Sequence, residues 1–386
     1  MKHQKRNLRG IFQSIGLVFG DIGTSPIYAL AAFFTLIPST PGNALGIISL
    51  IIWALTIVVS IKYGWLVMSL SKKSEGGTIV LKELLVPLLR SPRQIAIASF
   101  LSILGISLLI GDGVITPAVT ILGAVEGLIY IPGLEYLKGN IVLVCIAAVI
   151  AIALFMFQRQ GSDRVSSAFA PVMCLWFGVL AFSGIAAITQ YPAILYALNP
   201  YYGIAFLYQH AMHGMFILSC LILCITGAEA LYADMGHLGR RPISIAWIFV
   251  FIALALNYLG QGAFVASCGC GGLEVNVLFA MVRHQTALLY IPFVVLSICA
   301  AVIASQSLIS GVFSIVYQGI STRILPIFKI DYTSTQLRSQ IYIGFANWFL
   351  LTCVLIVMFV FQSVARLTEA YGLAVAGTMV ITGILA

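Results

Sequence analysis

The sequence predicts an all-α polytopic membrane protein. Of its 386 residues, 61% are hydrophobic and 8% are charged, and the mean hydropathy is +1.08. These values are typical of membrane proteins and lie outside the range of soluble domains. The apolar residues gather in runs of about 20, the length that crosses a bilayer as a helix. The sequence therefore predicts one transmembrane domain over residues 1–386.

We expect ten membrane spans in this domain. Their ranges are 11–36, 46–70, 95–128, 140–157, 165–189, 213–235, 243–266, 286–320, 342–361 and 367–386. With a cytoplasmic N-terminus, 16 of the 20 Lys and Arg residues fall in segments on the inner side, which is the positive-inside bias. The first apolar run lacks a small-residue cleavage site, so we expect a retained helix and not a signal peptide.

Several classes of function are disfavoured by the sequence. The net charge of +8 is explained by loops on one side, and no basic patch alternates with exposed aromatics, so we expect no nucleic-acid partner. The chain has no G-x-x-x-x-G-K-[ST] loop and no T-V-G-Y-G filter, which disfavours ATP hydrolysis and a filter channel of the potassium type. Cys268 with Cys270, and His210 with His213, lack further metal ligands nearby. We expect neither an enzyme nor a cofactor.

Residues 20–26, GDIGTSP, interrupt the first predicted span. Pro26 has no N–H for the carbonyl of Ile22, and the glycines ease departure from helical geometry, so carbonyl oxygens are expected to be freed beside Asp21. A bilayer tolerates such a break, and its carboxylate, only where they line a cavity. Nearby hydroxyl groups add hard oxygen ligands for a cation, on Thr24, Ser25 and Tyr28. The alternative is a proline-kinked helix whose aspartate only caps the second half.

A second interruption is predicted at residues 225–229, ITGAE, in the sixth span. It lies five spans after the first, and an odd offset inverts the direction, so the two halves could be inverted repeats with discontinuous first helices. Glu229 would then lie at membrane depth, where a carboxylate can exchange a proton when water or a cation arrives. Proton-coupled carriers need such a group.

The third span carries further acidic and hydroxyl residues. Asp112, Thr116 and Thr120 fall on one helical face, although they could equally serve packing between helices. Glu126 near the end of this span could be only a solvated helix end. Lys62 in the second span is interpreted as structural, with a carboxylate or a helix carbonyl as partner.

Eight stretches resemble the KUP/HAK/KT potassium uptake transporters, and bacterial Kup-type members in particular. They are GDIGTSPIYAL (20–30), SEGGT (74–78), LLIGDGVITPAVTILGAVEGL (108–128), TGAEALYADMGHLGRRPI (226–243), LNYLGQGA (256–263), ASQSLISGVFSI (304–315), TSTQLRSQIYI (333–343) and AYGLAVAGTMVITGIL (370–385). They run along the whole chain, and several are long, which makes the resemblance specific.

The resemblance implies secondary-active potassium import, driven by protons, in a bacterial inner (cytoplasmic) membrane. It also implies a LeuT-like 5+5 inverted-repeat core of the APC superfamily with discontinuous helices 1 and 6. It would place potassium among six residues, namely Asp21, Tyr28, Thr116, Thr120, Thr226 and Tyr371. Glu229 would couple the proton, and Asp112 and Glu126 would be acidic residues of the pathway. The implied partners are potassium, protons, the lipid bilayer and a second copy in a homodimer, with no cofactor.

The family typically has twelve spans and a cytosolic C-terminal domain, so we expect this chain to hold the ten-helix core alone, as a fragment or a short paralogue. An amino-acid or other organic-substrate permease, and a truncated non-transporting paralogue, are the alternative functions. An amino-acid site needs a helix end without a carboxylate beside it, which Asp21 contradicts. A non-transporting protein has no need of three carboxylates at membrane depth, each costing roughly 2.5–3.5 kcal/mol.

Overall fold

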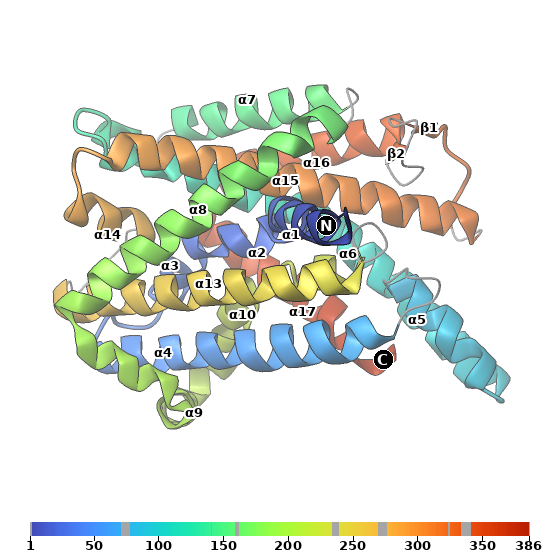
Figure 1. Ribbon diagram of the computed structural model, residues 1–386, viewed down its shortest axis with the longest axis horizontal. Helices are drawn as coiled ribbons and strands as arrows, with labels where there is room; N and C mark the ends of the chain where they lie inside the picture. The colour runs from blue at the N-terminus through green and yellow to red at the C-terminus, as the bar shows by residue number, and fades with distance from the viewer. Residues whose placement is uncertain are drawn as a thin grey trace.

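The computed structural model describes residues 2–70, 78–139, 141–158, 162–233, 239–268, 276–322, 325–332 and 341–385. Within these ranges, the side chains of 2–9, 78–79, 162–168, 230, 233, 332 and 369–374 are outside the description. The described part is a bundle of helices (Figure 1). It also contains one antiparallel pair of two-residue strands, which the all-α prediction did not include.

The elements follow the apolar runs of the sequence. Those of the first half are α1 (Lys2–Leu17), α2 (Gly20–Thr24), η1 (Ser25–Ile27), α3 (Ala29–Phe33), α4 (Pro41–Ala54), η2 (Leu55–Leu66), η3 (Val67–Ser69), α5 (Thr78–Leu85), η4 (Val86–Leu88), α6 (Pro92–Glu126), η5 (Gly127–Tyr130), η6 (Glu135–Leu137), α7 (Ile141–Phe157) and α8 (Ser162–Gln190). Those of the second half are η8 (Pro192–Leu198), α9 (Pro200–Gln209), η9 (Ala211–His213), α10 (Gly214–Cys224), α11 (Ala228–Ala233), α13 (Arg240–Cys268), α14 (Val277–Gln285), α15 (Tyr290–Ser321), β1 (Asp331–Tyr332), β2 (Ile341–Tyr342), α16 (Gly344–Phe361) and α17 (Val364–Leu385).

Six helical stretches of the described residues are long and apolar enough to cross a membrane. They are Pro41–Ser69, Pro92–Tyr130, Phe169–Gln190, Arg240–Cys268, Tyr290–Ser321 and Gly344–Phe361. A seventh results if Pro200–Gln209 and Ala211–Cys224, bent by 88°, form one span. The chain is thus an all-helical polytopic membrane protein apart from its short strand pair. Helix also occupies part of each predicted range, while the number of ten spans and the single domain stay predictions.

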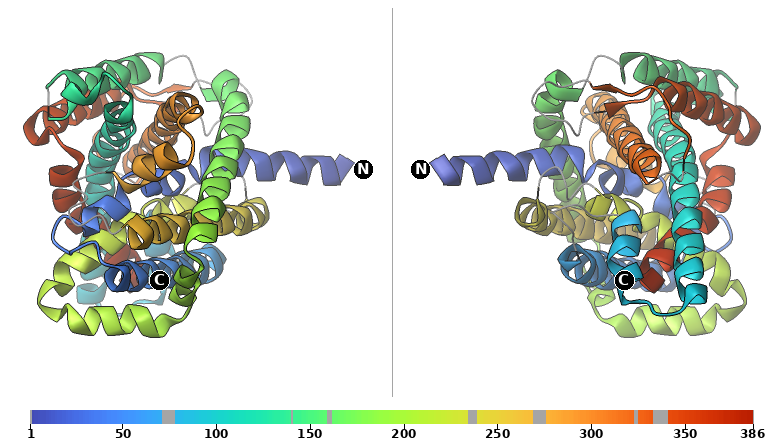
Figure 2. Two further views of the ribbon diagram at one scale, coloured as in Figure 1. Left: turned by 90° about the vertical axis from the view of Figure 1, so that its left-hand side faces the viewer. Right: turned by 90° about the vertical axis from the view of Figure 1, so that its right-hand side faces the viewer.

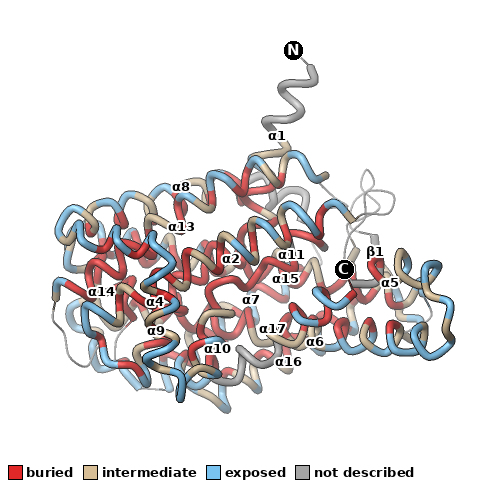
Figure 3. Tube along the Cα trace, turned by 90° about the horizontal axis from the view of Figure 1, so that it is seen from below, coloured by how far each residue is buried: buried red, intermediate tan, exposed pale blue. Residues whose placement is uncertain are grey.

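Burial follows the pattern of a protein surrounded by lipid. Large apolar side chains lie on the outside, such as Trp65 and Phe182, which are 68% and 75% exposed. Three acidic side chains, those of Asp21, Asp112 and Glu229, are buried instead, and Asp21 is only 3% exposed. In Figure 3 the central elements, including α2, α11 and α15, are mainly buried. Burying a charged group costs free energy, so these buried acidic residues point to a functional role.

Two helices of the bundle are interrupted, and each consists of consecutive shorter segments. The first is α1–α2–η1–α3, and α1 projects from the bundle at its N-terminal end (Figure 2). The second is α10–α11. The first contacts α8, α13 and α15, and α10 contacts α17. The long helices therefore form a frame around both interruptions.

The crossing of α8 and α13 in this frame depends on two glycines. α8 runs diagonally across α13 in Figure 1. A Cβ atom on Gly184 would lie 2.2 Å from the Leu256 carbonyl oxygen, and one on Gly260 would lie 2.4 Å from the Gly184 Cα atom. The two backbones can approach this closely only without side chains at the crossing, as in other membrane helix pairs.

Replacing Gly184 by alanine should therefore destabilise the protein. We expect a loss of about 1–3 kcal/mol, because the added methyl group forces backbones apart. The matched control is Gly178→Ala on the same helix, where no atom lies within 4 Å of the added Cβ. Thermal unfolding of the detergent-solubilised protein, followed by tryptophan fluorescence, measures both. Equal melting temperatures for the two variants would contradict this packing.

Candidate functional site

The first helix is interrupted on both sides of Asp21. α1 ends at Leu17, and Phe19 donates its N–H to the Ser14 carbonyl at 3.4 Å. The short helix α2 then passes into the 3-10 turn η1, which contains Pro26. Contrary to expectation, Gly23 lies inside helical backbone, since its N–H bonds the Phe19 carbonyl at 3.0 Å. The departures from α-helix fall before Gly20 and from Ser25 to Tyr28.

Donors from other helices occupy three carbonyl oxygens around the second departure. Trp176 Nε1 donates to the Gly23 carbonyl at 2.8 Å, Gln261 Nε2 donates to that of Pro26 at 3.1 Å, and Asn276 Nδ2 donates to that of Ile27 at 2.5 Å. The expectation that the break frees carbonyl oxygens as ion ligands is therefore wrong for these three. The physical reason is that a buried carbonyl without a partner is costly, and nearby helices supply one.

The hydroxyl groups of the same stretch also serve the backbone. Thr24 Oγ1 donates to the carbonyls of Gly20 and Asp21, at 3.2 and 3.0 Å. The Ser25 hydroxyl bonds the Thr226 hydroxyl at 3.0 Å, across 201 residues of sequence. This bond joins the first interruption directly to the second.

The second interruption is sharper, because a residue with positive φ separates α10 from α11. Gly227 has φ +84°, a conformation that glycine adopts without steric cost. A Cβ atom there would lie 2.8 Å from the Ile22 nitrogen and 3.1 Å from Asp21 Oδ2. Gly227 thus fixes both the turn and the close contact between the two interrupted helices.

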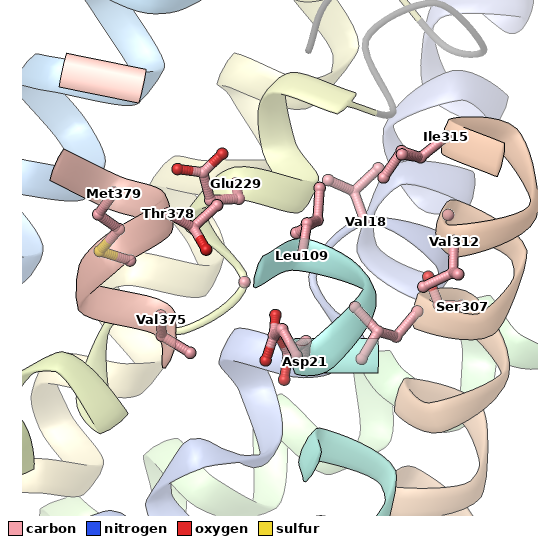
Figure 4. Close-up of a pocket in the computed structure, with 14 residues that line it drawn as sticks. Val18, Asp21, Leu109, Glu229, Ser307, Val312, Ile315, Val375, Thr378 and Met379 are labelled. Atoms are coloured by element: carbon pink, nitrogen blue, oxygen red, sulfur yellow. The ribbon is translucent and has the colours of Figure 1, made fainter. Parts of the chain in front are cut away.

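A cavity opens beside this contact and holds three carboxylate residues (Figure 4). Asp21, Asp112 and Glu229 come from three different helices, and their side chains are 3%, 6% and 8% exposed. The remaining lining is mainly apolar, namely Val18, Leu109, Gly227, Ser307, Leu308, Gly311, Val312, Ile315, Val375, Thr378 and Met379. Negative charge in an apolar, buried space attracts cations strongly.

The three carboxylates differ in their hydrogen-bond partners. Both oxygens of Asp21 are buried and have no hydrogen-bond partner among the described residues. Asp112 Oδ1 instead accepts from the Thr116 hydroxyl at 2.7 Å, one helical turn away. Asp21 is therefore the carboxylate of this cavity that most needs a positive charge, because a buried anion without donors is unstable.

Glu229 is held by two hydroxyl donors. Tyr63 Oη donates to Glu229 Oε1, and Thr382 Oγ1 donates to Oε2 at 3.1 Å. The sequence analysis named no donor for Glu229, and both donors come from helices far away in sequence.

The predicted hydroxyl ligands lie close to the meeting point of the two interruptions. The Thr120 hydroxyl oxygen is buried and has no hydrogen-bond partner in the described part of the chain, and the buried Tyr28 hydroxyl lies beside the Ser25 and Thr226 hydroxyls. A Cβ on Gly123 would lie 3.3 Å from the Ile27 side chain, so α6 packs against η1. Thr226 lies in the second turn and also donates to the Leu223 carbonyl at 3.1 Å.

Two predicted residues are not placed with this group. The Tyr371 side chain falls outside the described residues. Glu126 is not among the cavity lining, and its Oε1 accepts from the Val364 N–H at 3.3 Å, at the start of α17. A carboxylate at a helix N-terminus stabilises that helix, which is a structural role.

Sequence reasoning missed Tyr63, Thr382 and Thr378 near the cavity. The signal for Tyr63 was its neighbour Lys62, an intramembrane lysine whose expected carbonyl partner is Met379, at 2.8 Å. The signal for the threonines was their spacing of four residues, which puts them on one face of α17. Nothing in the sequence showed that this face meets Glu229.

The comparisons with known proteins agree with the resemblance. A model of the K+ potassium transporter integral membrane domain matches residues 8–386. The chain belongs to the KUP/HAK/KT potassium transporter family. Three relatives are named probable potassium transport system proteins of the Kup type.

The relative from Geotalea uraniireducens (strain Rf4) is 58% identical over 385 residues, covering 100% of this chain and 63% of its own. Kup 2 of Geobacter sulfurreducens is 58% identical over 377 residues, covering 97% and 62%. The Methanosarcina acetivorans protein is 57% identical over 381 residues, covering 99% and 62%. The chain therefore spans less than two thirds of the length of these relatives.

The Gly227 turn gives the first test of this site. Gly227→Ala should lower stability by about 1–3 kcal/mol, because alanine is strained at φ +84° and its methyl group would displace Asp21. The control is Gly214→Ala at the start of α10, where the added Cβ meets nothing within 4 Å. Thermal unfolding in detergent compares the variants. If Gly227→Ala melted like the control, the close contact of the two turns would be wrong.

Proposed function

We propose that this chain takes up potassium by secondary active transport, and that Asp21 is the residue that holds the ion. The observation that carries the proposal is the buried Asp21 carboxylate without a hydrogen-bond partner among the described residues, at the contact of two interrupted helices. A monovalent cation would supply the missing charge. The relatives' names, which refer to potassium transport, favour potassium as that cation.

The proposed ligands are all oxygens. Beside Asp21 they are the hydroxyl groups of Tyr28, Thr116, Thr120, Thr226 and Tyr371. Hydroxyl groups and one carboxylate suit a large, weakly hydrated ion, whereas Mg²⁺ demands octahedral geometry and retains several waters. The buried Thr120 hydroxyl, which has no hydrogen-bond partner among the described residues, supports this set, because buried polar atoms normally have partners.

The proposed scaffold is a LeuT-like 5+5 inverted repeat. Support comes from the two interruptions, which lie in the predicted spans one and six and contact each other through Ser25–Thr226 and Asp21–Gly227. In such folds the discontinuous helices of the two repeats form a site near the middle of the membrane. Here both interruptions border the same cavity.

Proton coupling is proposed for Glu229. It lines the same cavity as Asp21, so two negative charges face one apolar space. Like charges in such a space disfavour each other, and binding one proton and one potassium ion would neutralise both. The proton would change the hydrogen bonds that Glu229 accepts from Tyr63 and Thr382, which gives protonation a structural consequence.

The location and partners are proposals of the same kind. The positive-inside bias of the sequence supports a bacterial cytoplasmic membrane with a cytoplasmic N-terminus. A carrier of this type needs no cofactor, and a homodimer follows from the family resemblance alone. An organic-substrate permease is disfavoured, because Asp21 would repel a substrate carboxylate at the helix interruption.

Growth complementation tests the proposed function. The chain is expressed in a bacterial host that lacks its own potassium uptake systems and is grown at limiting potassium. We expect potassium-dependent rescue, since the sequence of this chain includes every residue of the proposed ion site. Rescue by a full-length relative but not by this chain would show that it does not transport alone.

Asp21→Asn should weaken potassium binding by about tenfold or more, since it removes the one full charge of the site from a low-dielectric environment. Equilibrium binding of radioactive rubidium to the purified protein, with potassium as competitor, measures this loss. The control is Glu135→Gln, which removes a carboxylate from the exposed turn η6. Unchanged binding by Asp21→Asn would reject Asp21 as the main ligand.

Glu229→Gln should separate potassium binding from proton movement. Rubidium binding is expected to stay within about twofold, because the glutamine leaves Asp21 in place. Potassium-driven acidification inside proteoliposomes should disappear, because an amide cannot carry the proton. Proton entry at the wild-type rate in this variant would exclude Glu229 as the coupling residue.

A further inference from the structure

A π-helical stretch, η2, faces the Glu229 side of the cavity. It presents two consecutive polar residues, Lys62 and Tyr63, to α17 and α11. Segments of π-helix are rare and occur frequently at functional sites. The wide turn has a local signature, since the Ser60 hydroxyl bonds the Leu55 carbonyl five residues back, at 3.1 Å.

The Glu229 carboxylate is held by hydroxyl donors on two of these helices. Tyr63 donates to one of its oxygens and Thr382 donates to the other. Tyr63 is fully buried, so water does not compete for its hydroxyl group. Figure 4 shows Glu229 beside Thr378 and Met379 of α17, while Asp21 lies farther along the cavity.

Lys62 adds positive charge on the same side. Its Nζ donates to the Met379 carbonyl at 2.8 Å. It also packs against Gly383, where an added Cβ atom would lie 3.0 Å from Nζ. The ammonium group is close enough to attract the Glu229 carboxylate. Glu229 therefore has two donors and a counter-charge, whereas Asp21 has no hydrogen-bond donor among the described residues.

We propose that Tyr63 and Thr382 determine the ion specificity of the cavity by holding the Glu229 carboxylate away from the cation at Asp21. The inference rests on the proposed potassium site. The inference goes beyond that site because it explains why the site would prefer monovalent to divalent cations. A divalent cation needs more negative charge and more carboxylate oxygens than one aspartate supplies. With both donors in place, Asp21 is the carboxylate of the cavity that has no hydrogen-bond donor among the described residues, since Asp112 accepts from Thr116.

The arrangement weakens the binding of divalent cations and does not strengthen the binding of potassium. Without the two hydroxyl donors, Glu229 would turn towards the cavity that it already lines. Asp21 and Glu229 would then form a site with two carboxylates, which suits Ca²⁺. Asp112 follows the same logic, because its Oδ1 accepts from Thr116.

The test measures binding of radioactive calcium to the purified protein in lipid nanodiscs. Tyr63→Phe and Thr382→Val remove one donor each with little change of shape, and the double variant removes both. We expect the double variant to bind calcium about tenfold more tightly than wild type, with each single variant in between. The gain should vanish when Glu229→Gln or Asp21→Asn is added, because it needs both carboxylates.

The matched control is Tyr290→Phe. Tyr290 is also buried, and its hydroxyl donates to the Gly127 carbonyl at 2.6 Å. This bond does not involve Glu229. This variant loses the same kind of bond and should bind calcium like wild type. Rubidium binding by every variant that retains Asp21 shows that the protein is folded, and thermal unfolding gives the same check for the variants that carry Asp21→Asn. If the double variant does not fold, each single variant tests the inference by itself.

Two outcomes would overturn the inference: wild-type calcium affinity in all donor variants that still bind rubidium, or a calcium gain that persists with Glu229→Gln. Failure of the wild-type protein to bind rubidium would count against the proposed function instead. The calcium measurement is independent of transport, so the two failures are distinguishable.

Discussion

The interrupted first helix depends on hydrogen-bond donors that other helices supply, because a bilayer offers no water to carbonyl groups that leave a helix. Trp176 of α8, Gln261 of α13 and Asn276, the N-cap residue of α14, donate to three carbonyls between Gly23 and Ile27. These bonds connect the irregular segment to its neighbours. It can then hold a side chain in the middle of the protein at a fixed position.

That side chain is the Asp21 carboxylate, and its surroundings contrast with those of Glu229. The Asp21 carboxylate has no hydrogen-bond partner among the described residues, whereas the Glu229 carboxylate accepts from two hydroxyl donors. Hydrogen bonds to an anion replace its lost hydration, and a bound cation does the same by charge. The proposed function interprets this difference as a division of roles, with Asp21 proposed to hold the ion and Glu229 held by the protein.

The sequence was sufficient to place both interruptions. Glycine and an acidic residue within an apolar run, as at 20–26 and 225–229, with a proline as well at 20–26, favour a break that faces a cavity. The family resemblance then supplied the ion and the list of ligands. The break in the first span was displaced by a few residues from its predicted position, since Gly23 stays helical.

The partners of these groups could not be predicted. Trp176 bonds Gly23 across 153 residues and Thr382 bonds Glu229 across 153, and such contacts depend on how the helices pack. A side chain that serves a distant backbone carbonyl looks, in sequence, like any polar residue of a membrane helix. For this reason the sequence does not reveal that Gln261 serves the Pro26 carbonyl or that Tyr63 serves Glu229.

The most direct measurement is the position of a bound ion. Rubidium replaces potassium in such sites and gives an anomalous diffraction signal. Crystals of the protein grown in rubidium should show their strongest anomalous peak in contact with the Asp21 carboxylate, near the turn at residues 225–227, and this peak should be absent from Asp21→Asn crystals. A strongest peak at Glu229 in the wild-type protein, with none at Asp21, would contradict the account.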